Sequence, residues 1–225
     1  MLSTGGKYFV SAGEDHYARV WEVDTGKEIA HMLHNAALLS VVFSPDGKYI
    51  VSGSNDSTAH IWETATGKEI ARMTHGGTNV FAVFSPNSKY VISRSSDNIA
   101  IVSQATTGKE IARMTHDGTL LSAYFSPNGR YVVSDVCEEI VTSDSTCTKG
   151  TTRMWEVATG KETTRMTHEN YADSIFSPDG NYMLSWGDKT IYIWESAAGK
   201  EIARMTHDDN VLSLHSAWTA NMLCQ

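Results

Sequence analysis

Residues 34–75 read HNAALLSVVFSPDGKYIVSGSNDSTAHIWETATGKEIARMTH, and this stretch decides the fold. The apolar run at 38–43 predicts a short strand buried on both faces. The Ser-Pro-Asp-Gly sequence at 44–47 is typical of a tight turn, because Pro presets φ and Gly ends the turn. Three more strands are predicted over 48–53, 58–63 and 69–74, separated by Asn-Asp and Thr-Gly turns. The stretch therefore predicts one small sheet of four antiparallel strands.

The same pattern recurs along the whole chain. A Gly-Lys-Glu turn places its glycine at positions 26, 67, 108, 160 and 199, in steps of 41, 41, 52 and 39 residues. A period near forty residues indicates a repeat architecture. A sheet of this kind cannot bury its faces alone, whereas radial stacking of copies buries them. We therefore expect an all-β fold: a β-propeller of five four-stranded blades, the first completed by a C-terminal strand.

Composition narrows the classes of partner and compartment. The chain has 225 residues, with 18 Lys+Arg against 26 Asp+Glu, so its formal net charge is −8. This balance argues against nucleic acid as a partner, because phosphate affinity comes mainly from Lys and Arg. No apolar stretch approaches the roughly 18 residues of a membrane span, and the N-terminus lacks a signal-peptide pattern. Three cysteines make no disulfide framework. We expect a cytoplasmic chain with no membrane contact and no cofactor.

The repeats also predict the domain organisation. We expect a single domain over 1–225, in which the first repeat lacks its innermost strand. The segment 210–214 matches that missing strand, so pairing of the two chain ends would close a monomeric ring of five blades. The alternative is a fragment of a longer array, which would need further blades or self-association. The predicted boundaries are 1–33 (partial), 34–74, 75–115, 116–167, 168–206, a closing strand at 207–214 and an irregular tail at 215–225.

The order of motifs resembles a known family. His34, then Phe-Ser-Pro-Asp-Gly at 43–47, then Ser-Asn-Asp at 54–56 and Ile-Trp-Glu at 61–63 is similar to a blade of the WD-repeat β-propeller family, with Trp-Glu in place of the usual Trp-Asp. The resemblance covers about residues 2–214. The high similarity among the repeats resembles bacterial multi-domain proteins whose propellers act as sensors or scaffolds. It implies a protein–protein interaction module that binds another protein or peptide and has no catalytic activity.

The resemblance also implies a buried hydrogen-bond network of His, Ser, Asp and Trp in each blade. The matching positions are His34, Ser52, Asp56 and Trp62; His75, Ser93 and Asp97; His116, Ser134 and Trp155; His168, Ser185, Asp188 and Trp194; and His207 with Ser11, Asp15 and Trp21. Two positions depart from the pattern, since Ser103 replaces a Trp and Lys149 replaces an Asp. Loss of the Trp predicts that the third blade is the loosest regular one.

The fourth repeat is stretched by about eleven residues, roughly Asp135–Lys149, between its second and third strands. We expect a long loop there, which is either a partner contact or weak acidic cation site, or a tolerated insertion. Pairing of Cys137 with Cys147 is not supported by the expected compartment or by their separation.

In WD-repeat propellers the rim that follows each repeated His is commonly the partner-binding face. The candidates at this rim, including two acids of the insertion, are His16, Asn79, Asn98, Asp117, Glu138, Glu139, Tyr171, Trp186, Lys189 and Asp208. Tyr171 and Trp186 stand out because exposed aromatic side chains make good interface anchors. Either could instead pack between blades.

The sequence argues against three specific kinds of functional site. Ser, His and Asp recur in every blade, whereas a hydrolase triad is one constellation with an oxyanion hole. A Walker A loop needs Ser or Thr after Gly-Lys, and this chain has Glu. Five of the nine histidines come one per blade, and His16, His31, His60 and His215 fall at unrelated blade positions, so none is clustered at metal-ligand spacing. We therefore predict no catalytic, cofactor-binding or metal site. Two alternatives stay open: an enzyme of the central channel, if three or more acids converge near Asp173, and a decaying repeat array.

Overall fold

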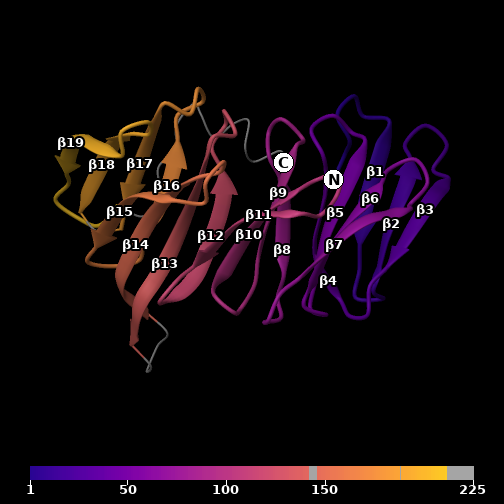
Figure 1. The fold of residues 1–225 in the computed structure, drawn as a ribbon, viewed down its shortest axis with the longest axis horizontal. Helices are drawn as coiled ribbons and strands as arrows, with labels where there is room; N and C mark the ends of the chain where they lie inside the picture. The colour runs from indigo at the N-terminus through magenta and orange to yellow at the C-terminus, as the bar shows by residue number, and fades with distance from the viewer. Residues whose placement is uncertain (142–145, 188, 212–225) are drawn as a thin grey trace. The chain divides into compact units, whose positions relative to one another are not determined.

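The computed structural model describes residues 1–141, 146–187 and 189–211, and these form nineteen strands in five antiparallel sheets (Figure 1). The all-β prediction is confirmed, because the described residues contain no helix. In particular, they form no helix that is long and apolar enough to cross a membrane. Each sheet joins strands that are consecutive in the sequence, which is the topology of propeller blades.

The chain divides into two compact units, Met1–Thr115 and His116–Gln225, and the division falls on a predicted repeat boundary. The single-domain organisation and the closure of the ring stay predictions. Residues 212–214 of the proposed closing strand and the predicted tail at 215–225 lie outside the described residues.

Unit 1 contains three sheets. The first has three strands, β1 (Tyr8–Ala12), β2 (Tyr17–Glu22) and β3 (Glu28–Leu33), with Leu2 bridging to Phe9 beside β1. The second comprises β4 (Leu38–Phe43), β5 (Tyr49–Ser54), β6 (Thr58–Glu63) and β7 (Glu69–Thr74). The third comprises β8 (Phe81–Phe84), β9 (Tyr90–Arg94), β10 (Ile99–Gln104) and β11 (Glu110–Thr115). Sheet one therefore lacks a full innermost strand, as the sequence predicts.

Unit 2 contains two four-stranded sheets. One comprises β12 (Thr119–Phe125), β13 (Tyr131–Val141), β14 (Thr146–Glu156) and β15 (Glu162–His168). The other comprises β16 (Asp173–Phe176), β17 (Tyr182–Trp186), β18 (Thr190–Glu195) and β19 (Lys200–Thr206).

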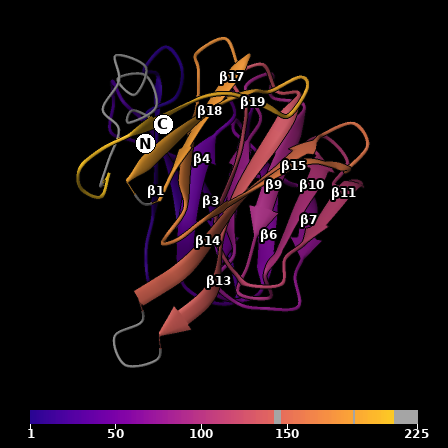
Figure 2. The same cartoon turned by 90° about the vertical axis from the view of Figure 1, so that its left-hand side faces the viewer.

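The insertion of the fourth repeat is a strand extension, and the prediction of a long loop is wrong. β13 and β14 are eleven residues each, and they pair from Tyr131 with Glu156 out to Val141 with Thr146 (Figure 2). The reason is that the inserted residues lengthen both strands, so the backbone N–H and C=O groups of β13 pair with those of β14. A hairpin ladder satisfies these groups internally, which a loop does not.

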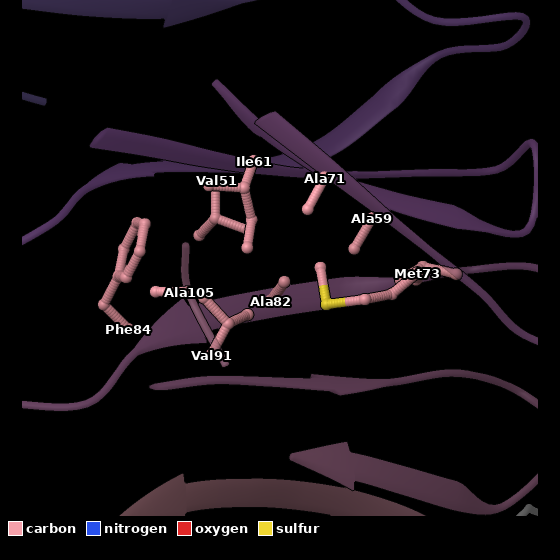
Figure 3. Close-up of a cluster of buried hydrophobic side chains, with 10 residues drawn as sticks. Val51, Ala59, Ile61, Ala71, Met73, Ala82, Phe84, Val91 and Ala105 are labelled. Carbon is pink, nitrogen blue, oxygen red and sulfur yellow. The ribbon is translucent and has the colours of Figure 1, made fainter. Parts of the chain in front are cut away.

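The second sheet is buried on both faces. Ile50 and Trp62 pack with Val10 and Val20 of the first sheet. Val51 and Ile61 point the other way and pack in a cluster that includes Val91 of the third sheet (Figure 3). Successive residues of a strand face opposite sides, so burial of both faces accounts for the adjacent apolar pairs Ile50-Val51 and Ile61-Trp62.

The Ser-Pro-Asp-Gly turn forms as its residues predict. Gly47 adopts φ 71° and donates its N–H to the Ser44 carbonyl at 2.8 Å. The Ser44 hydroxyl donates to Asp46 at 2.6 Å and accepts from the Tyr49 N–H at 2.9 Å. The turn therefore satisfies its own polar groups and sets the start of β5.

Candidate functional site

The second blade contains a complete buried network. Trp62 Nε1 donates to Ser52 Oγ at 2.7 Å, and Ser52 Oγ lies 2.7 Å from His34 Nε2. His34 Nδ1 lies 3.0 Å from Asp56 Oδ2, and Asp56 also accepts the Asn35 N–H at 2.9 Å. The implied set of four residues is therefore brought together here, and its role is to satisfy polar groups inside the sheet.

The other blades keep parts of this network. Three Ser–Trp bonds form: Trp21 to Ser11 at 2.9 Å, Trp155 to Ser134 at 2.9 Å and Trp194 to Ser185 at 3.1 Å. His116 also reaches Ser134 at 2.8 Å. Asp15 pairs instead with Arg19 at 2.6 Å. Asp188 lies outside the described residues. The assignment of His207 to the first blade would join the two units and stays a prediction.

The third blade has lost a donor together with its Trp. His75 Nε2 lies 2.8 Å from Ser93, but His75 Nδ1 is 3.8 Å from Asp97, against 3.0 Å in the second blade. Ser103 is buried, and its hydroxyl has no partner among the described residues. These distances agree in direction with a looser blade.

Two of the candidate contact residues already have a structural role. His16 and Asn98 adopt φ of 70° and 62°, and Ser57 takes the same place in the second blade with φ 69°. These are left-handed turn positions between the second and third strands, which Asn and His tolerate better than most residues. The turn alone explains these side chains.

Trp186 is not an exposed anchor, so that prediction is wrong. It is 6% exposed, and it pairs with Asp173 and Ile191 in the sheet. Ser185 beside it is also buried, which means that both faces of β17 are covered at this point. Tyr171, in contrast, is 47% exposed and stays a candidate for partner contact.

The extended hairpin of unit 2 carries a cluster of charges around Arg153, which sequence reasoning missed. Arg153 is fully buried, and its guanidinium lies 3.4 Å from Glu138 and 3.6 Å from Asp117. Lys149 lies 3.0 Å from Glu138 on the other side. Asp117, Glu138 and Lys149, to which the sequence analysis gave no common role, are therefore brought together. They meet because Arg153 on β14 lies close to Glu138 on the neighbouring strand β13.

A disulfide joins Cys137 and Cys147 across this hairpin, with their Cα atoms 5.8 Å apart. The sequence left this pairing unsupported, and the structure shows it. Their separation of ten residues is bridged because β13 and β14 run antiparallel, so that Cys137 and Cys147 come to lie on neighbouring strands.

A cavity of about 670 Å³ lies beside the hairpin in unit 2. The hairpin supplies Glu139 and Lys149. The other sheet of unit 2 supplies Tyr192 of β18 and Lys189 just before that strand. Lys189 donates to the Asp208 carbonyl oxygen at 2.7 Å, which joins a further candidate residue to this wall. The cavity thus gathers two of the predicted contacts, Glu139 and Lys189, beside the repeated His168, while Asp208 contacts Lys189 without lining the cavity.

Asp135 forms a buried junction between the two sheets of unit 2. Its carboxylate accepts hydrogen bonds from Ser122 and Thr152 at 2.7 Å and from Ser174, on the next sheet, at 2.8 Å. Burial raises the pKa of Asp135 to about 6, although these hydrogen bonds lower it. Burial also raises the pKa of the nearby Asp173.

These two carboxylates do not make a catalytic cluster of the expected kind. In the described part of the chain, the one group of three metal-ligating side chains is His34, Asp56 and His60 in unit 1. The channel-enzyme alternative asks for three or more acids near Asp173; Asp135 is one such neighbour among the described residues, and the alternative stays a prediction.

Comparison with protein families adds to this geometry. Residues 26–63 and 161–195 match the family model described as WD domain, G-beta repeat. These two segments are similar to WD40 repeats. The first match runs from the turn before β3 to the end of β6, and the second from β15 to β18. The matched segments include Ser52, Asp56 and Trp62 in one unit and Ser185 and Trp194 in the other. No curated protein sequence matches the chain.

Proposed function

We propose that this chain is a scaffold or sensor module of WD-repeat type, without catalytic activity, that binds another protein or a peptide. WD40 repeats typically serve as interaction scaffolds, which supports the coarse assignment. The contact is made by unit 2, through the β13–β14 hairpin and the cavity beside it. One observation carries this choice: the fourth repeat is stretched into a hairpin of two eleven-residue strands, and its extra residues form a wall of the cavity.

The chemistry of the cavity suits an extended peptide. Its lining includes the hydroxyls of Thr148, Thr167 and Thr190 and the amides of Asn170 and Asn210. These groups both donate and accept, so they can bond a peptide backbone of any sequence. Two lysines and two glutamates add both signs of charge, so a segment with a mixed charge pattern fits better than a polyanion.

A capture experiment with matched variants tests the proposal. The whole chain, immobilised, is exposed to extract of its source organism, and bound proteins are cross-linked and identified. We compare wild type with the double variant Glu139→Lys, Lys189→Glu, which inverts two exposed charges at the cavity. Lys161→Glu is the control, because Lys161 is exposed on a Gly-Lys-Glu turn of the same unit.

A partner that wild type and Lys161→Glu retain, and that the double variant loses at least about tenfold, supports the proposal. Its cross-links should map to the hairpin. Equal retention by all three chains, or cross-links confined to the Gly-Lys-Glu turns, contradicts it. Circular dichroism of each variant controls for folding.

The cytoplasmic location, the bacterial origin and the monomeric state belong to the same proposal. The odd number of cysteines supports a cytoplasmic chain, whereas the bond between Cys137 and Cys147 favours an oxidising compartment. Counting free thiols in chain isolated from its source tests this, because a reducing compartment would leave Cys137 and Cys147 unpaired.

A further inference from the structure

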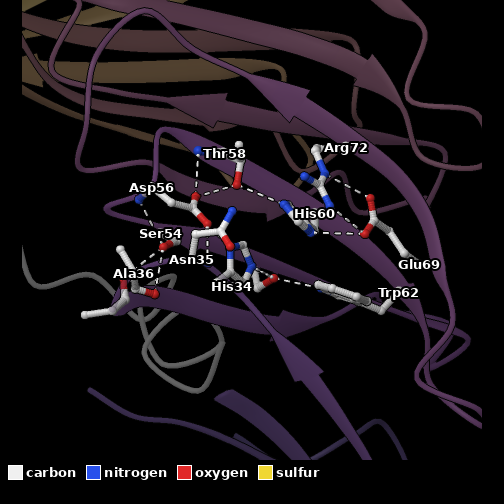
Figure 4. Close-up of polar contacts among 12 residues, drawn as sticks. His34, Asn35, Ala36, Ser54, Asp56, Thr58, His60, Trp62, Glu69 and Arg72 are labelled. Carbon is white, nitrogen blue, oxygen red and sulfur yellow. Dashed lines mark hydrogen bonds and ion pairs between the residues drawn. The ribbon is translucent and has the colours of Figure 1, made fainter. Parts of the chain in front are cut away.

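The buried network of the second blade extends beyond the four residues that the family resemblance implies. Thr58 donates its hydroxyl to Asp56 Oδ1, and the same hydroxyl lies 2.9 Å from His60 Nε2 (Figure 4). Since the Thr58 proton is used on Asp56, His60 Nε2–H is the donor to Thr58. Asp56 therefore links two histidines. His34 contacts its Oδ2 directly, and His60 is connected to its Oδ1 through the Thr58 hydroxyl.

This arrangement leaves one lone pair without a donor. His60 Nδ1 is buried with no hydrogen-bond partner among the described residues, and the side chain is 3% exposed. The group that faces Nδ1 is another acceptor, Glu69 Oε2, at 3.5 Å. Arg72 holds Glu69 in place through two bonds of 3.0 Å. Glu69 is 34% exposed and already bonds Arg72, so the unsatisfied group is His60 Nδ1, a buried acceptor that a cation would complement.

The ligand set indicates which cation fits. One ligand atom from each of His34, Asp56 and His60 lies within 4.8 Å of the others, and the two imidazole rings are 4.2 Å apart. Imidazole nitrogens with carboxylate oxygens suit zinc and similar transition metals, whereas calcium and magnesium prefer oxygen ligands alone.

We propose that His34, Asp56 and His60 bind a divalent transition-metal ion of the zinc class, with Glu69 as the nearest further ligand. Ligands at about 2.0–2.2 Å from a tetrahedral zinc ion lie roughly 3.4 Å apart. Binding therefore needs the side chains to close by about an ångström or more. The hydrogen bond between His34 and Asp56 gives way to the metal, while Ser52 still orients His34 from the opposite ring nitrogen.

The site belongs to the second blade alone. The position of His60, opposite the network serine, is held by Arg19, Ile101, Arg153 and Tyr192 in the other blades. None of these supplies a second imidazole, so four blades of the same chain act as internal controls. The metal would link the loop before β4, the β5–β6 turn and β6 within one sheet.

The test is metal titration of the full chain without reductant, with Co²⁺ followed by its visible absorption and Zn²⁺ by calorimetry. His60→Ile and His60→Gln remove the second imidazole. Ile101 occupies the equivalent site, which makes Ile compatible with the fold, and Gln keeps a donor for Thr58. His31→Ala is the control, because the His31 side chain is 65% exposed in another blade.

We expect one equivalent of tetrahedral Co²⁺ and a rise in the melting temperature with Zn²⁺ for wild type and His31→Ala. Both His60 variants should bind at least tenfold more weakly and show no rise in melting temperature. Equal binding by wild type and the His60 variants overturns the proposal. So does the absence of stoichiometric binding in wild type whose folding is confirmed by circular dichroism.

Discussion

The buried carboxyl of Asp135 makes the stability of unit 2 depend on pH. The group binds its proton more tightly in the folded chain, where its pKa is about 6, than in the unfolded chain, where it is near 3.8. Stability is therefore highest below about pH 4 for this group, falls as pH rises from about 4 to about 6, and stays lower above that window. A rise of about two pKa units corresponds to about 3 kcal/mol of lost unfolding free energy.

Asp135→Asn tests this reasoning. The Asn side chain is nearly isosteric and carries no charge, and its amide can donate to the hydroxyls of Ser122, Thr152 and Ser174, which also accept. We expect the variant to lack the fall of about 3 kcal/mol between pH 4 and 6, and to be no less stable than wild type at pH 7.

The assay is urea unfolding of the whole chain, followed by tryptophan fluorescence at several pH values from 4 to 7.5. Asp24→Asn, an exposed change in the other unit, is the control and should keep the wild-type profile. If Asp135→Asn also keeps the wild-type fall with pH, or if it loses several kcal/mol at pH 7, the account of Asp135 as a desolvated acid is refuted.

Three further changes have defined outcomes. Trp62→Ser copies the residue at the third-blade position and should cost about 3–5 kcal/mol in urea unfolding, because it leaves a large cavity and removes the donor to the network. A loss of unfolding free energy below about 1 kcal/mol would show that Trp62 contributes little to the stability of the blade. Gly53→Ala should lose at least about 1–3 kcal/mol, since the new Cβ would lie 2.3 Å from the Val80 carbonyl oxygen; an unchanged urea midpoint would contradict this close approach. Reduction of the disulfide between Cys137 and Cys147 should cost about 3 kcal/mol by the chain-entropy model for a loop near ten residues. Adding a reductant should leave the urea midpoint of Cys137→Ser unchanged. A shift in this variant would show that the reductant acts on stability by a route other than the disulfide.

Most of the strand pattern could be predicted because its signals are local. The predicted strands at 38–43, 58–63 and 69–74 match β4, β6 and β7, and the strand at 48–53 is one residue from β5. Alternation of side chains along a strand and the turn chemistry of Pro, Asp and Gly act over a few residues, so the sequence carries them directly.

The site was harder to predict, because its residues meet only through sheet pairing. The register of the inserted residues, and with it the disulfide, depended on how two strands pair with each other. A useful signal did exist at the position opposite each network serine. It holds Arg19, His60, Ile101, Arg153 and Tyr192, the kind of divergence that marks specialisation in a near-identical repeat.

The sequence by itself determined the repeat, the five sheets, their turns and the Ser–Trp bonds inside the blades, since each depends on residues close in the chain or at a fixed offset. Only the tertiary structure decided that Trp186 is buried, that Asp135 reaches Ser174 and that His60 meets His34. Those outcomes depend on which faces two strands or two sheets present to each other, because burial and electrostatics act through space and not along the chain.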